Sequence, residues 1–166
     1  MSVSLSLRIS KDIKGHDMRI RKAQKSDLIS ILEMQKASFY EIAQRHDDFD
    51  IPPMTQTIEG LEDEFPLYDI YVAVKEGKCV GTIRCEFKGD TCEIGRLVVH
   101  KDYQNCGIGK KLMAYIEKTY SEIKRFELFT GSKDPKNLYF YESFGYKEFK
   151  RRPYKNYDLI YFEKLK

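Results

Sequence analysis

The strongest constraint on this chain is the stretch of residues 93–120, where an apolar segment passes through a short polar loop into an amphipathic segment. Ile94–Val99 predicts a strand, and the helical spacing of Leu112 and Ile116 predicts a helix entered through Gly107-Ile108-Gly109. Glycines at such a joint let the backbone approach a ligand closely. The first amides of a helix lack partners within it and carry positive potential. The stretch therefore predicts a turn that binds phosphate.

Two common phosphate-binding motifs do not fit this turn. A P-loop needs G-x-x-x-x-G-K-[ST], and a dinucleotide fingerprint needs a third glycine where this chain has Leu112. The run before the helix is Gln104-Asn105-Cys106-Gly107-Ile108-Gly109. It resembles the [QR]-x-x-G-x-[GA] acyl-CoA signature of the GNAT superfamily of N-acetyltransferases. Sequence alone also allows an ordinary strand–turn–helix joint with glycines for tight packing.

A second run, Asn137–Tyr146, is similar to the N-[IL]-x-[LF]-Y-x-x-[LF]-G-[FY] segment of many GNAT enzymes. The resemblance implies that Tyr141 lies near the thioester sulfur and protonates the leaving thiolate. It also implies that Asn137 contacts the pantetheine arm or the pyrophosphate of the cofactor. A phenol suits this role, because a pKa near 10 keeps it protonated at neutral pH. The alternative for Tyr141 is a core aromatic on an apolar helix.

The whole pattern predicts one α/β domain over residues 18–166, after an N-terminal arm or leader at residues 1–17. A chain of 166 residues with 42% apolar content can bury a core of its own. Its layout is similar to the GNAT (acyl-CoA N-acyltransferase) fold, which implies an α+β mixed, mostly antiparallel central sheet flanked by about four helices. The expected strands are 18–23, 71–75, 79–87, 91–99, 125–130, 146–151 and 159–164, and the expected helices are 26–42, 54–65, 107–122 and 137–144.

Ahead of this domain, residues 2–10 alternate apolar and polar side chains and predict a further strand. An extra edge strand, a partner-binding arm and a floppy leader all fit the pattern. As an edge strand, Val3–Ile9 would pair across a dimer. The chain is therefore expected to be a monomer or a homodimer.

Composition excludes several classes of function. The net charge of +3 gives no reason to expect a nucleic-acid partner. The four cysteines form no C-x-x-C pair and the three histidines lie far apart, so no metal site is predicted and a reducing, cytoplasmic compartment is expected. No apolar run is long enough to cross a membrane, and the N-terminus lacks a signal-peptide core.

The resemblance implies acetyl-CoA as the acetyl donor, held mainly by main-chain groups. The strand end would pair with pantetheine as a false strand, and amides near Val98 would polarise the thioester carbonyl. A lysine early in a helix is unfavourable unless an anion is bound, which agrees with a phosphate near Lys110; the alternative is a solvated lysine. The predicted cofactor-binding residues are Leu97, Val98, Val99, Gln104, Asn105, Cys106, Gly107, Ile108, Gly109, Lys110, Asn137 and Tyr141.

A general base is also needed, because the attacking amine must lose a proton. Glu93 lies eleven residues before Gln104. The base glutamate of the GNAT histone acetyltransferases has this same spacing on the same strand. The alternative is a surface glutamate in an alternating strand, and Glu41 and His100 are weaker candidates for the base.

The segment from residue 41 to residue 64 carries eight acidic side chains and one basic one. Because loops carry specificity and carboxylates attract cations, we expect a cationic acceptor: a polyamine, an aminosugar, a basic peptide or a lysine side chain. The alternative is a solvated acidic face. The predicted acceptor residues are Glu41, Asp47, Asp48 and Asp50.

Together these predictions describe an acetyl-CoA-dependent N-acetyltransferase. The amine would attack the thioester directly in a ternary complex, with Glu93 taking its proton and Tyr141 protonating the thiolate. The alternative is a CoA-binding sensor or interaction module that has this fold and little turnover.

Overall fold

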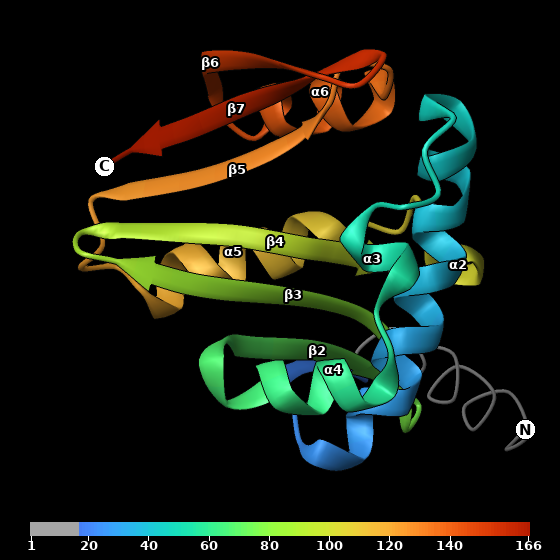
Figure 1. Ribbon diagram of the computed structural model, residues 1–166. Helices are drawn as coiled ribbons and strands as arrows, with labels where there is room; N and C mark the ends of the chain where they lie inside the picture. The colour runs from blue at the N-terminus through green and yellow to red at the C-terminus, as the bar shows by residue number, and fades with distance from the viewer. Residues whose placement is uncertain (1–16) are drawn as a thin grey trace, which may run out of the picture.

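The computed structural model describes residues 17–166, so the predicted strand at Val3–Ile9 lies outside the described part of the chain. The described residues form one seven-stranded sheet in the order β1-β2-β3-β4-β5-β7-β6 (Figure 1). Every neighbouring pair is antiparallel except β4 and β5, which confirms the mixed, mostly antiparallel sheet. The strands are β1 (Met18–Lys22), β2 (Asp69–Lys75), β3 (Lys78–Lys88), β4 (Thr91–Val99), β5 (Arg125–Gly131), β6 (Lys147–Tyr154) and β7 (Tyr157–Leu165).

Five α-helices lie within the described residues, against about four expected. The extra helix arises because the predicted helix 54–65 is two helices. Gln56 and Thr57 between them have extended backbones, and the Thr57 hydroxyl accepts a hydrogen bond from the Gly60 amide at 3.1 Å, which caps the second helix. The helices are α2 (Leu28–His46), α3 (Pro52–Thr55), α4 (Ile58–Glu64), α5 (Ile108–Thr119) and α6 (Pro135–Ser143).

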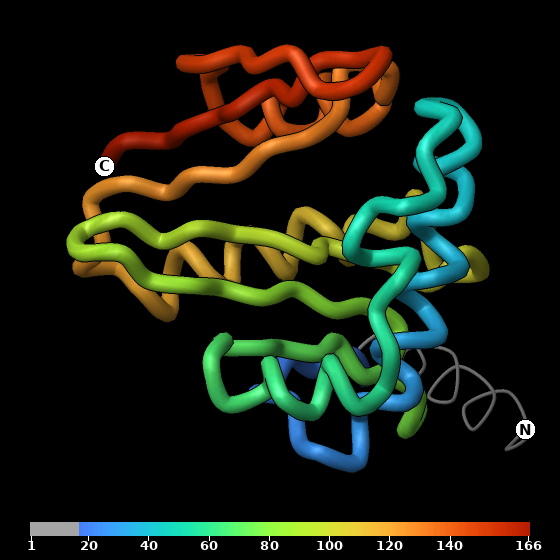
Figure 2. Tube along the Cα trace, in the orientation of Figure 1, coloured from blue at the N-terminus to red at the C-terminus, as the bar shows by residue number. Residues whose placement is uncertain are grey.

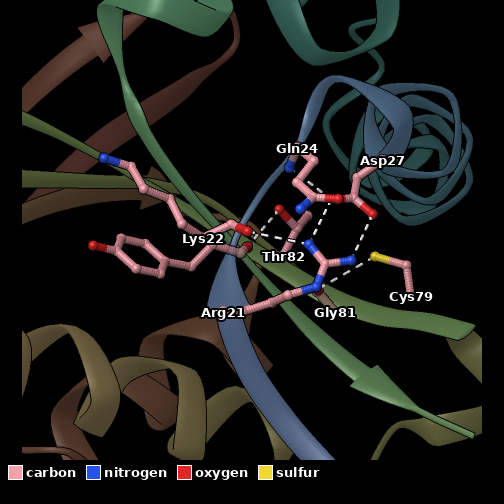
Figure 3. A network of polar contacts seen from close by, with 8 residues as sticks. Arg21, Lys22, Gln24, Asp27, Cys79, Gly81 and Thr82 are labelled. Atoms are coloured by element: carbon pink, nitrogen blue, oxygen red, sulfur yellow. Dashed lines mark hydrogen bonds and ion pairs between the residues drawn. The ribbon is translucent and has the colours of Figure 1, made fainter. Parts of the chain in front are cut away.

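The helix expected over residues 26–42 begins two residues later, as α2 at Leu28. A single 3₁₀ turn precedes the helix, and the Asp27 carboxylate accepts a hydrogen bond from the Gln24 amide at 2.7 Å. Arg21 on β1 donates to both carboxylate oxygens of Asp27, at 2.7 and 3.0 Å (Figure 3). This bidentate pair holds the start of α2 against the edge strand β1.

Helices cover both faces of the sheet (Figure 1). The helix α5 packs on one face over the larger apolar core, whose buried members include Leu112 and Ile116. The helices α2 and α4 contribute Leu28, Ile31 and Leu61 to a second core on β2. The α5 contact is especially close at Gly81 on β3, where an added Cβ would lie 3.1 Å from Leu112. The glycine thus lets α5 lie directly on the sheet, which fixes the position of its N-terminus.

The strands β4 and β5 pair only at one end. Their parallel ladder runs from Thr91 opposite Arg125 to Glu93 opposite Glu127, and the two strands then diverge (Figure 2). On its other side, β4 has a bulge against β3 at Arg96, whose φ of 49° is unusual for a residue with a side chain. Beyond Glu93, the β5-facing edge of β4 therefore has backbone donors and acceptors without a strand partner among the described residues.

Candidate active site

A cavity of about 460 Å³ lies where β4 and β5 diverge. It is bounded by the C-terminal half of α2, the end of β4, the start of α5 and the helix α6. The two sequence runs expected to bind the cofactor meet in it. The lining residues are Ser38, Glu41, Ile42, Arg45, Leu97, Val99, Tyr103, Gln104, Asn105, Gly107, Ile108, Gly109, Lys110, Asp134, Lys136, Asn137, Phe140 and Tyr141.

Two predicted cofactor residues do not line this cavity with the others. Val98 is buried, with 1% of its surface exposed, so its side chain belongs to the core and not to the cavity wall. Cys106 is exposed on the loop, and its thiol donates weakly to the Gln104 carbonyl at 3.5 Å. The Gln104 side chain in turn donates to the Val99 carbonyl at 3.2 Å, which ties the loop to the strand end.

The N-terminus of α5 faces this cavity without a cap. Gly107 occupies the cap position at φ 78°, no side chain accepts from the first turn, and that turn contains no acidic residue. The helix α4 is built in the opposite way, since Thr57 caps it and Glu59 lies in its first turn. The amides of Ile108 and Gly109 therefore remain free to bind an anion, strengthened by the helix dipole.

Cationic side chains surround the same cavity. Lys110 and Lys136 line it, and Arg45 pairs with the buried Asp134 at 3.2 Å. Asn137 donates to the same carboxylate at 2.9 Å, so its side chain is held in place at the wall. Sequence analysis missed Arg45, Asp134 and Lys136, because the contact between α2 and the start of α6 joins parts of the chain that are distant in sequence.

Tyr141 lines the cavity from α6. Its ring packs against Tyr146 and Phe162 with centroid distances of 6.3 and 6.2 Å. Burial, together with the nearby Asp134 carboxylate, raises the pKa of Tyr141 above its ordinary value. Its hydroxyl makes no hydrogen bond to any residue of the described chain. Tyr141 is thus a phenol that stays protonated and has its proton free for a bound molecule.

A second cavity, of about 320 Å³, lies further back along the same strands. Glu93 lines this cavity and not the one that holds Tyr141, and it accepts a hydrogen bond from Lys88 at 3.0 Å. Along β4, residues 93–95 therefore face the second cavity, whereas Leu97 and Val99 face the first. The remaining lining residues are Tyr68, Arg84, Glu86, Glu127, Leu128, Phe129 and Tyr161.

The four acids predicted to bind the acceptor are separated by the fold. Glu41 lines the first cavity, and Asp47 and Asp50 are exposed and line neither of the two described cavities. Asp48 is 3% exposed and accepts hydrogen bonds from Lys155 at 2.5 Å and from Tyr157 at 2.8 Å. The Asp48 carboxylate thus joins the end of α2 to the β6–β7 hairpin.

Asp48→Asn is expected to lower the free energy of unfolding by about 2–3 kcal/mol, because it breaks a buried, charge-assisted contact. Burial alone would raise the pKa of Asp48, but hydrogen bonds from Lys155 and Tyr157 outweigh it and hold this pKa below its ordinary value. This stabilisation is therefore complete above about pH 4 and is lost as the pH falls through the lowered pKa. Urea unfolding at pH 7 and in acid measures both effects.

The matched control is Asp50→Asn, which removes an exposed carboxylate from the same loop. We expect it to change stability by less than about 0.5 kcal/mol. A stable Asp48→Asn variant with a raised KM for the amine would contradict the structural role and assign Asp48 to the acceptor.

A family model described as an acetyltransferase (GNAT) domain matches residues 66–148. No curated protein matches the chain in sequence. Within residues 17–166, no helix has both the length and the apolar character that crossing a membrane requires.

Several solved structures have the same fold. PaiA N-acetyltransferase from Thermoplasma acidophilum, in complex with coenzyme A, is 20% identical, with a TM-score of 0.76 over 90% of this chain and 99% of that chain. A GNAT-family acetyltransferase from Staphylococcus aureus is 23% identical, with a TM-score of 0.69 over 87% and 97% of the two chains. A chimera of spermidine N-acetyltransferase SpeG from Vibrio cholerae and hSSAT is 15% identical, with a TM-score of 0.71 over 90% and 95%.

Proposed function

The chain belongs to the GNAT acetyltransferase family, and we propose that it transfers an acetyl group from acetyl-CoA to a primary amine by direct attack in a ternary complex. One observation carries the proposal: the open edge of β4, the uncapped start of α5 and the hydroxyl of Tyr141 meet in a single cavity. These three features supply a surface for an extended chain, a site for phosphate and a proton donor.

The residues of the cavity fit acetyl-CoA, which supplies the acetyl group as an activated thioester. The free amides at the start of α5 bind the pyrophosphate, and Lys110 and Lys136 add positive charge beside them. The unpaired edge of β4 from Leu97 to Val99 hydrogen-bonds the pantetheine arm as a neighbouring strand would. An amide of this edge, near Val98, stabilises the negative charge that develops on the carbonyl oxygen.

Two side chains handle the protons in this proposal. Tyr141 donates its phenolic proton to the sulfur as the C–S bond breaks, and its raised pKa keeps that proton in place until then. Glu93 accepts the proton that leaves the amine as the N–C bond forms. Because Glu93 lines the second cavity, the acceptor enters from that side, and its proton reaches Glu93 directly or through water.

Glu93→Gln is expected to lower kcat by about 10- to 100-fold, since it removes a general base. The loss should shrink as the pH rises and more of the amine is already neutral. Steady-state rates between pH 6 and 10 measure this. The matched control is Glu86→Gln, which removes the carboxylate directly across the β3–β4 ladder, beside the same lysine. Equal losses in the two variants would show that only the local charge matters.

The acceptor is an amine, and the acidic segment supports a cationic one only in part. Asp48 is occupied by Lys155 and Tyr157, so the attraction would come from Glu41, Asp47 and Asp50. One structure of the same fold is named a spermidine N-acetyltransferase, so polyamines belong among the amines to be tested. If neutralising Asp47 and Asp50 together leaves the KM of a polyamine unchanged at low salt, these carboxylates do not steer it.

The deciding experiment is a CoA-release assay with acetyl-CoA and a panel of amines: polyamines, aminosugars, lysine peptides and amino acids. We expect release of CoA that depends on the amine, with the acetylated amine identified by mass. CoA binding with no turnover on any amine would instead favour the alternative function, a CoA-binding sensor or interaction module.

Compartment and assembly stay predictions. All four cysteines are free thiols, including Cys85 and Cys92 on neighbouring strands, which agrees with a reducing cytoplasm. Cell fractionation tests the location. Sedimentation of the full chain, and of a variant that lacks residues 1–14, distinguishes a monomer from a homodimer held by the N-terminal arm.

A further inference from the structure

Arg96 is a half-buried cation without an anionic partner in the described chain. Its Nε is fully buried and makes no hydrogen bond, and no carboxylate among residues 17–166 lies within ion-pair distance of its guanidinium. The guanidinium lies 5.9 Å from the ring centre of Phe39 on α2. Burial, together with the charge of Arg84, lowers the pKa of Arg96 to about 10. Such a group is costly to bury, because the charge loses water and forms no ion pair of its own.

The surroundings add further positive charge, and the Glu64 carboxylate offsets it only in part. Arg84 on β3 also lies on this side of the sheet, where it donates to Glu64 at 2.8 Å and stacks on Tyr68 at 4.0 Å. The same Glu64 oxygen accepts a second hydrogen bond, from Gln56 at 2.7 Å. Two arginines therefore share one carboxylate that is already bound to one of them. This imbalance favours the binding of an external anion.

The position of Arg96 connects this anion site to the proposed reaction. On β4 it stands between Gly95, which lines the second cavity, and Leu97, which lines the first. Its φ of 49° at the bulge turns this residue out of the regular strand, a strained conformation at the place where the two cavities approach. Glu93 and Glu127 lie further along the second cavity. Arg96 itself lines neither cavity but adjoins Gly95, and Arg84 lines the second cavity together with these carboxylates, so a small molecule there would meet both signs of charge.

We propose that Arg96, assisted by Arg84, binds an oxyanion of the acceptor, so that the acceptor is a small amine that also carries a carboxylate or a phosphate. The proposal rests on the proposed function and narrows its acceptor class. Both Nη groups of Arg96 lack protein acceptors within the described residues, and a planar guanidinium binds an oxyanion through two parallel hydrogen bonds. The second cavity, at about 320 Å³, suits a molecule of amino-acid size.

Arg96→Met tests whether this cation is structural. Methionine keeps an unbranched stem against Phe39 and meets the same positive φ, so the two side chains differ mainly in charge. If Arg96 serves ligand binding and does not stabilise the fold, the variant should have an unchanged or higher melting temperature. The matched control is Arg152→Met on β6, an exposed arginine that lines neither cavity. A clear fall in melting temperature for Arg96→Met alone would overturn the proposal.

Matched acceptors test the recognition itself. The value of kcat/KM is compared among three acceptors that share one side chain: the free amino acid, its amide and the decarboxylated amine. An aminoalkyl phosphate is a separate arm. We expect the wild type to prefer an anionic acceptor by about 10- to 100-fold. The preferred arm identifies carboxylate or phosphate. In Arg96→Met the preference should fall to about threefold or less. A wild type without preference, or a variant that retains it, contradicts the proposal.

Binding separates this inference from the proposed function. Calorimetry of the protein–CoA complex with an N-acetylated amino acid and an N-acetylated aminoalkyl phosphate requires no turnover. We expect one of them to bind the wild type and to lose about 10-fold or more in affinity in Arg96→Met. Binding that depends on Arg96 without turnover of any amine would refute the transferase and retain the anion site. Turnover of amines without such binding would support the transferase and refute the anion site.

Discussion

Tyr141→Phe is expected to lower kcat for acetyl transfer by about 100- to 10,000-fold, with the KM for acetyl-CoA changed by less than about threefold. The variant removes one hydroxyl and keeps the ring that packs against Tyr146 and Phe162. The departing thiolate then loses its proton donor, while the contacts that hold the cofactor remain. Steady-state release of CoA at saturating amine measures kcat and KM together.

The control is Tyr139→Phe, which makes the same chemical change two residues earlier on α6. Tyr139 is 75% exposed and does not line the described cavity, so we expect kcat within about twofold of the wild type. A raised KM with an unchanged kcat in Tyr141→Phe would assign the hydroxyl to binding.

The pH dependence of kcat at alkaline pH follows from the direction of the pKa shift of Tyr141. Burial raises this pKa above its ordinary value near 10, so the acid form persists through neutral and mildly alkaline pH. Any alkaline fall in kcat caused by loss of this proton should therefore begin above about pH 10. A fall below that pH must come from another group, because Tyr141 is still protonated there.

Gly109→Asp is expected to weaken CoA binding by about 100-fold or more, because it places a carboxylate among the amides proposed to bind the pyrophosphate. The same change should leave the free protein as stable or more stable. Aspartate in the first turn of α5 interacts favourably with the helix dipole, by about 0.3–1 kcal/mol, and replaces a helical glycine. Calorimetry with CoA and thermal unfolding measure these opposite effects.

Gly109→Asn is the matched control, since it adds nearly the same volume without charge. A Cβ at this position would lie 3.5 Å from the Phe140 ring, which is an ordinary contact, so both side chains fit. We expect Asn to weaken CoA binding far less than Asp, and added salt to reduce the difference. Equal affinities in the two variants would place the pyrophosphate away from the start of α5.

The two cavities explain why these effects should be separable. Tyr141 and Gly109 line the cavity proposed for the donor, whereas Glu93 lines the one proposed for the acceptor. Substitutions at Tyr141 and Gly109 should change proton donation and cofactor affinity without altering the choice of amine. Arg96, between the two sides, should change that choice and leave CoA affinity unaffected.

Local patterns in the sequence determined the fold class and predicted most of the residues that line the first cavity. The apolar run before Gly107 and the helical spacing after it predicted a strand, a turn and α5, and these are present within two or three residues of their expected bounds. Such features depend on neighbours in the chain, through hydrogen bonds and periodicity. The break inside the predicted helix 54–65 was missed, because the cap formed by Thr57 competes with a continuous helix only weakly in sequence.

Only the tertiary structure decided what the charged groups do. The sequence shows a carboxylate at Asp48. In the structure this carboxylate accepts hydrogen bonds from Lys155 and Tyr157, which are more than a hundred residues away in the chain. The sequence shows Glu93 on the strand that leads to the turn before α5. In the structure β4 diverges from β5, and Glu93 lines a different cavity from Tyr141. The sequence shows an ordinary arginine at Arg96, and only the fold leaves it without an anion. A charge acquires its role from its partners and its burial, and both are set by contacts between distant parts of the chain.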